Sequence, residues 1–129
     1  MKKGADINTN DRENKNVLYK ACDNENFEMV KYLVENGAVI NTNDKVEQTT
    51  LHRAVKKGNL KILKYLVENG ADVNTVNKDK DTVLHWAFYY RHIEIVKYLI
   101  EHGADINMVN KYNETPLFLL GNNIKNKIK

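Results

Sequence analysis

Apolar residues recur along this chain with the spacing of a helix that has one buried face. In the clearest segment, Ile93, Val96, Leu99 and Ile100 follow one another at intervals of three, three and one residues. This spacing places the four side chains on one face of a helix, with charged residues standing between them in the sequence. The pattern therefore predicts an amphipathic helix near residues 93–100.

The same pattern returns at a fixed interval along the whole chain. The glycines at positions 4, 37, 70 and 103 are separated by 37−4, 70−37 and 103−70 residues, and each difference is 33. A leucine and a Lys-Tyr-Leu segment keep the same step, at Leu18, Leu51, Leu84 and Leu117, and at 31–33, 64–66 and 97–99. This regularity predicts a single domain over 1–129, with a partial unit 1–10, full repeats 11–43, 44–76 and 77–109, and a partial C-terminal unit 110–129.

Each unit predicts two helices followed by a turn region. Thr82 is suited to begin a first helix, because its hydroxyl can accept a hydrogen bond from an unpaired backbone N–H. The second helices are expected to start near one aligned position, at Asn26, Asn59 and His92. A glycine in the left-handed conformation ends each of them. In the turn that follows, we interpret Asn41, Asn74 and Asn107 as residues that bond their own backbone.

These residues resemble the ankyrin repeat, which has a 33-residue period and a Thr-Pro-Leu-His-x-Ala signature. The signature stands at 49–54 as Thr-Thr-Leu-His-Arg-Ala, at 82–87 as Thr-Val-Leu-His-Trp-Ala, and at 115–118 as Thr-Pro-Leu-Phe. The Lys-Tyr-Leu-Val-Glu-Asn-Gly-Ala-Asp wording of 64–72 is similar to ankyrin proteins of giant viruses, protists or anaerobic fungi. The resemblance implies an all-α solenoid of stacked helix-turn-helix units with projecting β-turn or hairpin loops.

The chain departs from the family's pattern in its turns and at its ends. The turn glycine of the family is replaced by Asn14, Glu47, Lys80 and Asn113. Because Glu and Lys tolerate a positive φ poorly, we expect the loops of the second and third repeats to be strained or differently shaped. The first ten residues lack both helices of their unit, so either the chain caps itself or it belongs to a longer array.

Composition and charge narrow the class of protein. With 42% hydrophobic and 29% charged residues, the 129-residue chain can form a core and is unlike a disordered tail. Acidic residues number 17 against 20 basic ones, and their interleaving argues against nucleic-acid binding. One cysteine excludes an intramolecular disulfide, and no apolar run reaches membrane-spanning length. We therefore expect an intracellular, cytoplasmic monomer that binds neither nucleic acid nor membrane.

The residues that carry chemistry do not form a catalytic pattern. His52 and His85 occupy the same repeat position, and the resemblance implies that they hydrogen-bond the turn backbone of neighbouring units. Cys22 is interpreted as a packed thiol rather than a nucleophile. Asp79 and Asp81 are expected on a solvated turn tip, without a pocket to shift their pKa values. The sequence thus predicts no enzyme activity, no cofactor and no metal.

Residues at positions that do not repeat are not needed for the stacking of the units, so they are the candidates for partner binding. The resemblance places them on a concave groove lined by the turn tips and the first helices. The tip candidates are Lys45, Val46, Lys78, Asp79, Asp81 and Tyr112, and the first-helix candidates are Arg53, Lys56, Lys57, Trp86, Tyr89 and Tyr90. Trp and Tyr combine large area with a polar group and are typical of binding hot spots. A role of Trp86 as core between repeats is an equal alternative.

These observations predict a non-catalytic scaffold that binds another protein. Its partner is expected to bear acidic groups, which suit Arg53, Lys56 and Lys57, beside an apolar anchor for the aromatic residues. A structural spacer within a longer array, with recognition elsewhere, is the first alternative. A basic nucleic-acid-binding module is a more remote one.

Overall fold

The computed structural model describes residues 6–13, 15–42 and 49–120 of the chain. Three antiparallel helix pairs follow one another along the sequence, and residues 116–120 are helical where the described chain ends. The helices are α1 (Val17–Asp23), α2 (Phe27–Glu35), α3 (Thr50–Lys57), α4 (Leu60–Glu68), α5 (Val83–Tyr89) and α6 (Ile93–Glu101). The predicted all-α repeat architecture is therefore confirmed.

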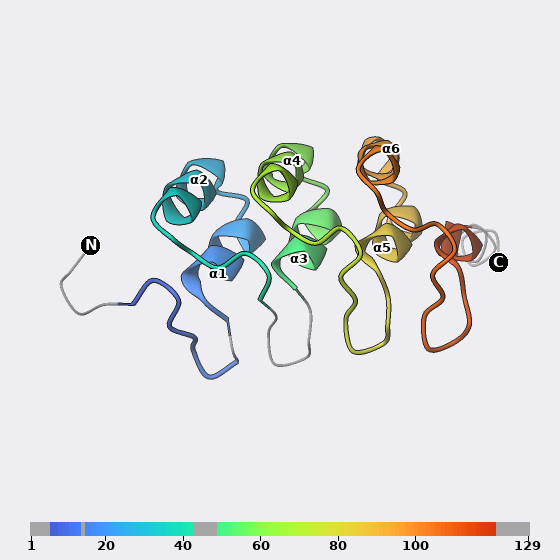
Figure 1. Cartoon of the computed structure of the whole chain (residues 1–129), viewed down its shortest axis with the longest axis horizontal. Coiled ribbons are helices and arrows are strands. Elements are labelled where there is room, and N and C mark those ends of the chain that lie inside the picture. Colours follow the sequence, from blue (N-terminus) through green and yellow to red (C-terminus); the bar gives the residue numbers. More distant parts are fainter. Residues whose placement is uncertain (1–5, 14, 43–48, 121–129) are drawn as a thin grey trace.

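The pairs stand side by side in a row with two layers (Figure 1). Helices α1, α3 and α5 contact one another in sequence and form one layer, and α2, α4 and α6 form the other. The loops over residues 69–82 and 102–115 project from the side of the layer that α1, α3 and α5 form (Figure 1). We call the surface formed by these three helices and the projecting loops the loop-side face.

Side-chain caps fix where the helices begin. The side chains of Asn16, Thr49 and Thr82 accept from a backbone N–H of the first turn of α1, α3 and α5, as predicted for Thr82. Asn26 and Asn59 do the same for α2 and α4. His92 begins α6 without a side-chain cap hydrogen bond. The aligned starts expected from the sequence are thus confirmed at all three second helices.

Asparagine side chains link each unit to the next. Asn41 Nδ2 donates to the Gly70 carbonyl at 3.1 Å, and Asn41 Oδ1 accepts from the Asp72 backbone N–H at 2.9 Å. Asn8 and Asn74 make the same pair of bonds to the units that follow them. The prediction that Asn41 and Asn74 bond their own backbone is wrong, because their amides reach across the repeat interface instead.

Buried histidines form a second link between units. His52 and His85 are fully buried, and Nε2 of each donates to a carbonyl of the following unit, at 2.9 Å to Asp81 and 2.7 Å to Glu114. Since a carbonyl can only accept, Nε2 carries the proton and Nδ1 accepts from the threonine that caps the same helix, at 2.8 and 2.9 Å. The structural role implied for both histidines is confirmed.

Residues other than glycine adopt left-handed conformations in the turns. Lys80 and Asn113 have φ of 61° at the tips, and Glu25 and Arg91 take the conformation that Gly58 has in the second repeat. A left-handed residue other than glycine is destabilising by roughly 1–2 kcal/mol, less for Asn. The strain expected at Lys80 is therefore present, while the loop keeps an antiparallel bridge between Val76 and Thr82. Asn14 and Glu47 lie outside the described residues.

The core runs between the two helix layers. Large side chains from every pair are fully buried there, including Leu18, Val30, Ile62, Leu63, Leu66, Leu84 and Leu99. In α6 the buried residues are Ile95, Val96, Tyr98 and Leu99. The predicted stripe is wrong for Ile93 and Ile100, which are 47% and 44% exposed, because α6 packs with Ile95 and Tyr98 turned inward.

Candidate functional site

An open pocket of about 220 Å³ lies on the loop-side face, between the α5 region and the last loop, residues 102–115. Helix α5 provides three aromatic side chains on one side of it, and the tip of the last loop provides Tyr112 on another. The lining residues are Asp81, Trp86, Tyr89, Tyr90, Asn110, Tyr112, Glu114 and Leu119. We call this the aromatic pocket. Four of the predicted aromatic candidates and one tip aspartate therefore meet in a single cavity.

The rings of α5 contact one another edge to face. The centroids of Trp86 and Tyr90 are 6.2 Å apart at an interplanar angle of 81°, and those of Tyr89 and Tyr90 are 5.1 Å apart at 87°. Trp86 also meets the buried His52 ring at 4.9 Å. Edge-to-face contacts of this kind stabilise a pair of rings by about 0.5–1.5 kcal/mol beyond the area that they bury. The three rings therefore support one another as a cluster on the surface.

Exposure separates the roles of the aromatic residues. Tyr89, Tyr90 and Tyr112 are 42%, 37% and 64% exposed, although large apolar side chains are usually buried. Burial raises the pKa of Tyr90, and the neighbouring Tyr89 raises it further, while Arg53 acts in the opposite direction. Trp86 is half-buried, so it contributes to the packing between repeats and to the pocket wall at once.

An amide from the last loop supports the pocket's two carboxylates. Asn110 is buried, and its Nδ2 group donates to Asp81 Oδ1 at 2.9 Å and to Glu114 Oε1 at 2.8 Å. Its Oδ1 accepts from the backbone N–H groups of Tyr112 and Glu114 at 2.9 and 3.0 Å. One buried side chain therefore sets the shape of the loop and the position of both acidic groups.

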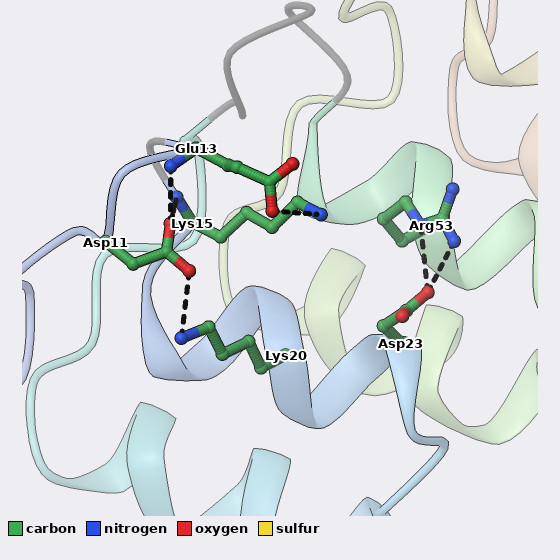
Figure 2. Close-up of polar contacts among 6 residues, drawn as sticks. All are labelled: Asp11, Glu13, Lys15, Lys20, Asp23 and Arg53. Atoms are coloured by element: carbon green, nitrogen blue, oxygen red, sulfur yellow. Dashed lines mark hydrogen bonds and ion pairs between the residues drawn. The ribbon is translucent and has the colours of Figure 1, made fainter.

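The basic candidates on α3 lie next to an acidic residue of α1. Arg53 donates through Nε to Asp23 Oδ1 at 3.1 Å and also through Nη2 (Figure 2). Lys57 Nζ lies 3.8 Å from the same oxygen. The hydrogen bond from Arg53, with the charges of Arg53 and Lys57, lowers the pKa of Asp23. Lys56 is exposed. The positive charge of this region is thus partly balanced within the chain.

The first repeat pairs its own charges in the same way. Lys20 Nζ lies 3.0 Å from Asp11 Oδ2, and Lys15 Nζ lies 3.6 Å from Glu13 Oε1 (Figure 2). These ion pairs are exposed and contribute little to stability. Because of these ion pairs, the first repeat presents fewer unpaired charges on the loop-side face than its sequence suggests.

The candidates at the loop tips have different surroundings. Asp79 forms an ion pair with Lys111 at 2.9 Å, and this contact raises the pKa of Lys111. Lys78 is exposed, as expected for a tip. Asp81 lines the aromatic pocket and is half-buried, so the prediction of a fully solvated tip is wrong for Asp81. Lys45 and Val46 lie outside the described residues.

Outside the aromatic pocket, the one cysteine of the chain has a packing role. Cys22 is fully buried, and burial raises the pKa of its thiol to about 12, which matches the predicted packed thiol. Over residues 6–13, 15–42 and 49–120, no three His, Cys, Asp or Glu side chains gather in a way that could hold a metal ion. None of the helices in this part of the chain has the length and apolar character needed to cross a bilayer.

Asn110 and Leu119 belong to the pocket but were not among the sequence-based candidates. Asn110 continues the 33-residue series Asp11, Asp44 and Asn77. Asn77 accepts from the N–H groups of Asp79 and Asp81, as Asn110 accepts from those of its own loop. A repeated position indicates a structural role, so the repeat did not mark Asn110 as a pocket residue. The repeat also could not reveal the contacts of Asn110 with two carboxylates. Leu119 carries no signal in the sequence that separates a pocket residue from a core residue.

Comparison with protein families agrees with this architecture. A family model described as ankyrin repeats in three copies matches residues 1–77, and a model described as ankyrin repeats in many copies matches residues 66–119. No curated protein matches the chain.

Proposed function

Because the chain belongs to the ankyrin-repeat family, whose repeats generally act as protein–protein interaction modules, we propose that it binds a partner protein through its loop-side face. The aromatic pocket is the centre of this binding surface. Neighbouring first helices and loop tips form its margin. No catalytic step is part of the proposal.

The observation that carries the proposal is the exposure of Tyr89, Tyr90 and Tyr112 around one cavity. Exposed aromatic residues at non-repeating positions do not serve the stacking of the units, which depends on the buried positions that repeat. Clustered rings lose little conformational entropy when a partner covers them, and they are enriched among binding hot spots. A spacer segment needs no such cluster on its surface.

The margin of the pocket favours a partner segment with acidic groups on the side of α3. Lys56 and Lys57 stand there, and Lys57 is only loosely paired with Asp23 at 3.8 Å. Charges at the margin of an interface act mainly on association rate and orientation. Acidic groups of the partner beyond the pocket would therefore set the direction in which the segment lies across the repeats.

Replacing Tyr89 and Tyr90 together by alanine is expected to weaken binding by at least about tenfold, because a hot-spot truncation removes 1 kcal/mol or more per residue. Binders are first selected from a displayed library of random peptides against the intact chain. Their affinities for the wild type and for the Tyr89→Ala/Tyr90→Ala variant are then compared by calorimetry.

Tyr32→Ala provides the matched control, since Tyr32 is exposed on α2, in the other helix layer. We expect this variant to bind the selected peptides with unchanged affinity. Equal affinities of the wild type and the double variant for every selected peptide would remove the aromatic pocket from the proposal and favour the spacer role.

A further inference from the structure

We propose that the aromatic pocket selects a cationic side chain, a lysine or arginine, as the anchor of the partner segment. This inference rests on the proposed function and specifies the chemistry of the same site. The expected anchor is then not purely apolar, because a lysine or arginine side chain joins an aliphatic part to a positively charged group. Three parts of the pocket's chemistry favour such an anchor, namely its aromatic rings, its carboxylates and the missing counter-charge.

The rings supply the first part. A cation placed within about 6 Å of the face of a Trp or Tyr ring is attracted by the negative charge on that face. Tyr112 already holds a cation within the chain, because Lys111 Nζ lies 5.3 Å from its ring centroid. Trp86, Tyr89 and Tyr90 present further rings to the same cavity.

The carboxylates supply the second part. Asp81 and Glu114 line the cavity together, and Asn110 holds one oxygen of each at 2.9 and 2.8 Å. The hydrogen bonds from one amide group fix the two acids in place without adding a positive charge. The centre of the pocket therefore carries negative charge, whereas the α3 side of its margin carries lysines.

The missing counter-charge supplies the third part. In the part of the chain that the structure describes, no lysine or arginine forms an ion pair with Asp81 or Glu114. The nearby Lys111 pairs with Asp79, and Arg53 is engaged with Asp23. Covering a carboxylate with a partner is unfavourable unless a positive group accompanies it, so these two favour a cation brought by the partner.

The shape of the pocket suits a long side chain with a charged end. Leu119 and the aromatic rings offer apolar surface, and the two acids lie beside them. Lys and Arg side chains bury their aliphatic stems against apolar surface while the charged group stays in a polar environment. An acidic side chain in the same place would face Asp81 and Glu114, and a purely apolar one would supply no positive charge to them.

The chain contains a single tryptophan, Trp86, and this residue reports directly on the pocket. The probes are the Nα-acetyl methylamides of lysine, arginine, norleucine and glutamate, titrated into the full chain. Binding is followed by the Trp86 indole N–H signal in NMR spectra. The two cationic probes are expected to bind at least about fivefold tighter than norleucine, and the glutamate probe to bind weakest of the four.

An Asp81→Asn/Glu114→Gln variant is expected to abolish the difference between the lysine and norleucine probes. Both amides keep an oxygen for Asn110, and thermal unfolding verifies that the variant is folded. Glu94→Gln is the control, because Glu94 is an exposed acid of α6 whose loss leaves the pocket unchanged. This control is expected to retain the full preference for the cationic probes.

Three results would overturn the inference. They are a norleucine probe that binds as tightly as the lysine probe, a preference that survives in the Asp81→Asn/Glu114→Gln variant, and no change of the Trp86 signal with any probe up to its solubility limit. The first two leave the proposed function intact, because an apolar anchor could still use the tyrosines. The proposed function itself is tested separately, by the peptide-binding comparison of the tyrosine variant and by mapping where a selected peptide binds.

Discussion

Replacing Leu66 by alanine is expected to lower the free energy of unfolding by about 2–5 kcal/mol. Leu66 is fully buried on α4, in the central repeat. Helix α4 packs against α2, α3 and α6, so the cavity opens at the junction of three units. In a stack of repeats, stability depends on nearest-neighbour interfaces, and a central defect weakens the interfaces on both sides.

Urea unfolding followed by circular dichroism measures this effect. Glu68→Ala is the control on the same helix, because Glu68 is exposed and its loss should change stability by less than about 0.5 kcal/mol. Leu66→Ala is also expected to make the transition less cooperative, since the units on either side become less coupled. A change as small as that of the control would contradict the stacked core described for the chain.

Replacing His85 by leucine is expected to destabilise the chain by about 2–4 kcal/mol, although leucine is apolar and of similar size. The histidine joins Thr82 of its own unit to the Glu114 carbonyl of the next unit, at 2.9 and 2.7 Å. Leucine would leave these groups without their partner in the interior. The decrease in the free energy of unfolding therefore measures the contribution of these hydrogen bonds between units, separately from that of apolar burial.

His102→Leu provides the comparison, because His102 is exposed at the end of α6. It should change the unfolding free energy by less than about 1 kcal/mol. Equal effects of the two substitutions would show that the buried histidine does not link the units.

Since Glu114 also lines the aromatic pocket, His85→Leu is further expected to weaken peptide binding by loosening the last loop.

The sequence predicted the framework well because the framework repeats. Cap residues such as Thr82 and helix-ending glycines act locally, so their roles follow from their position in the 33-residue period. Two predictions were wrong because they depended on contacts with the neighbouring unit. Asn41 and Asn74 bond across the repeat interface, and Ile93 and Ile100 stay exposed because the neighbouring helices contact a different face of α6.

The aromatic pocket, as a cavity, could be predicted only in part. Non-repeating aromatic residues indicated Trp86, Tyr89, Tyr90 and Tyr112, and the structure brings these four to one cavity. The balance of charge did not follow from the sequence, because pairing depends on distance between side chains of different units. Arg53 reaches Asp23 from the neighbouring helix pair, while Asp81 turns into the pocket instead of toward water.

The central claim is that the chain binds through the loop-side face at the aromatic pocket. The most direct test is to titrate a selected peptide into isotope-labelled full chain and to map the shifted backbone and side-chain NMR signals. The account predicts the largest shifts at Trp86, Tyr89, Tyr90 and Tyr112, with smaller ones along α3 at Lys56 and Lys57. Shifts confined to the outer helices α2, α4 and α6, with the Trp86 indole signal unmoved, would contradict it.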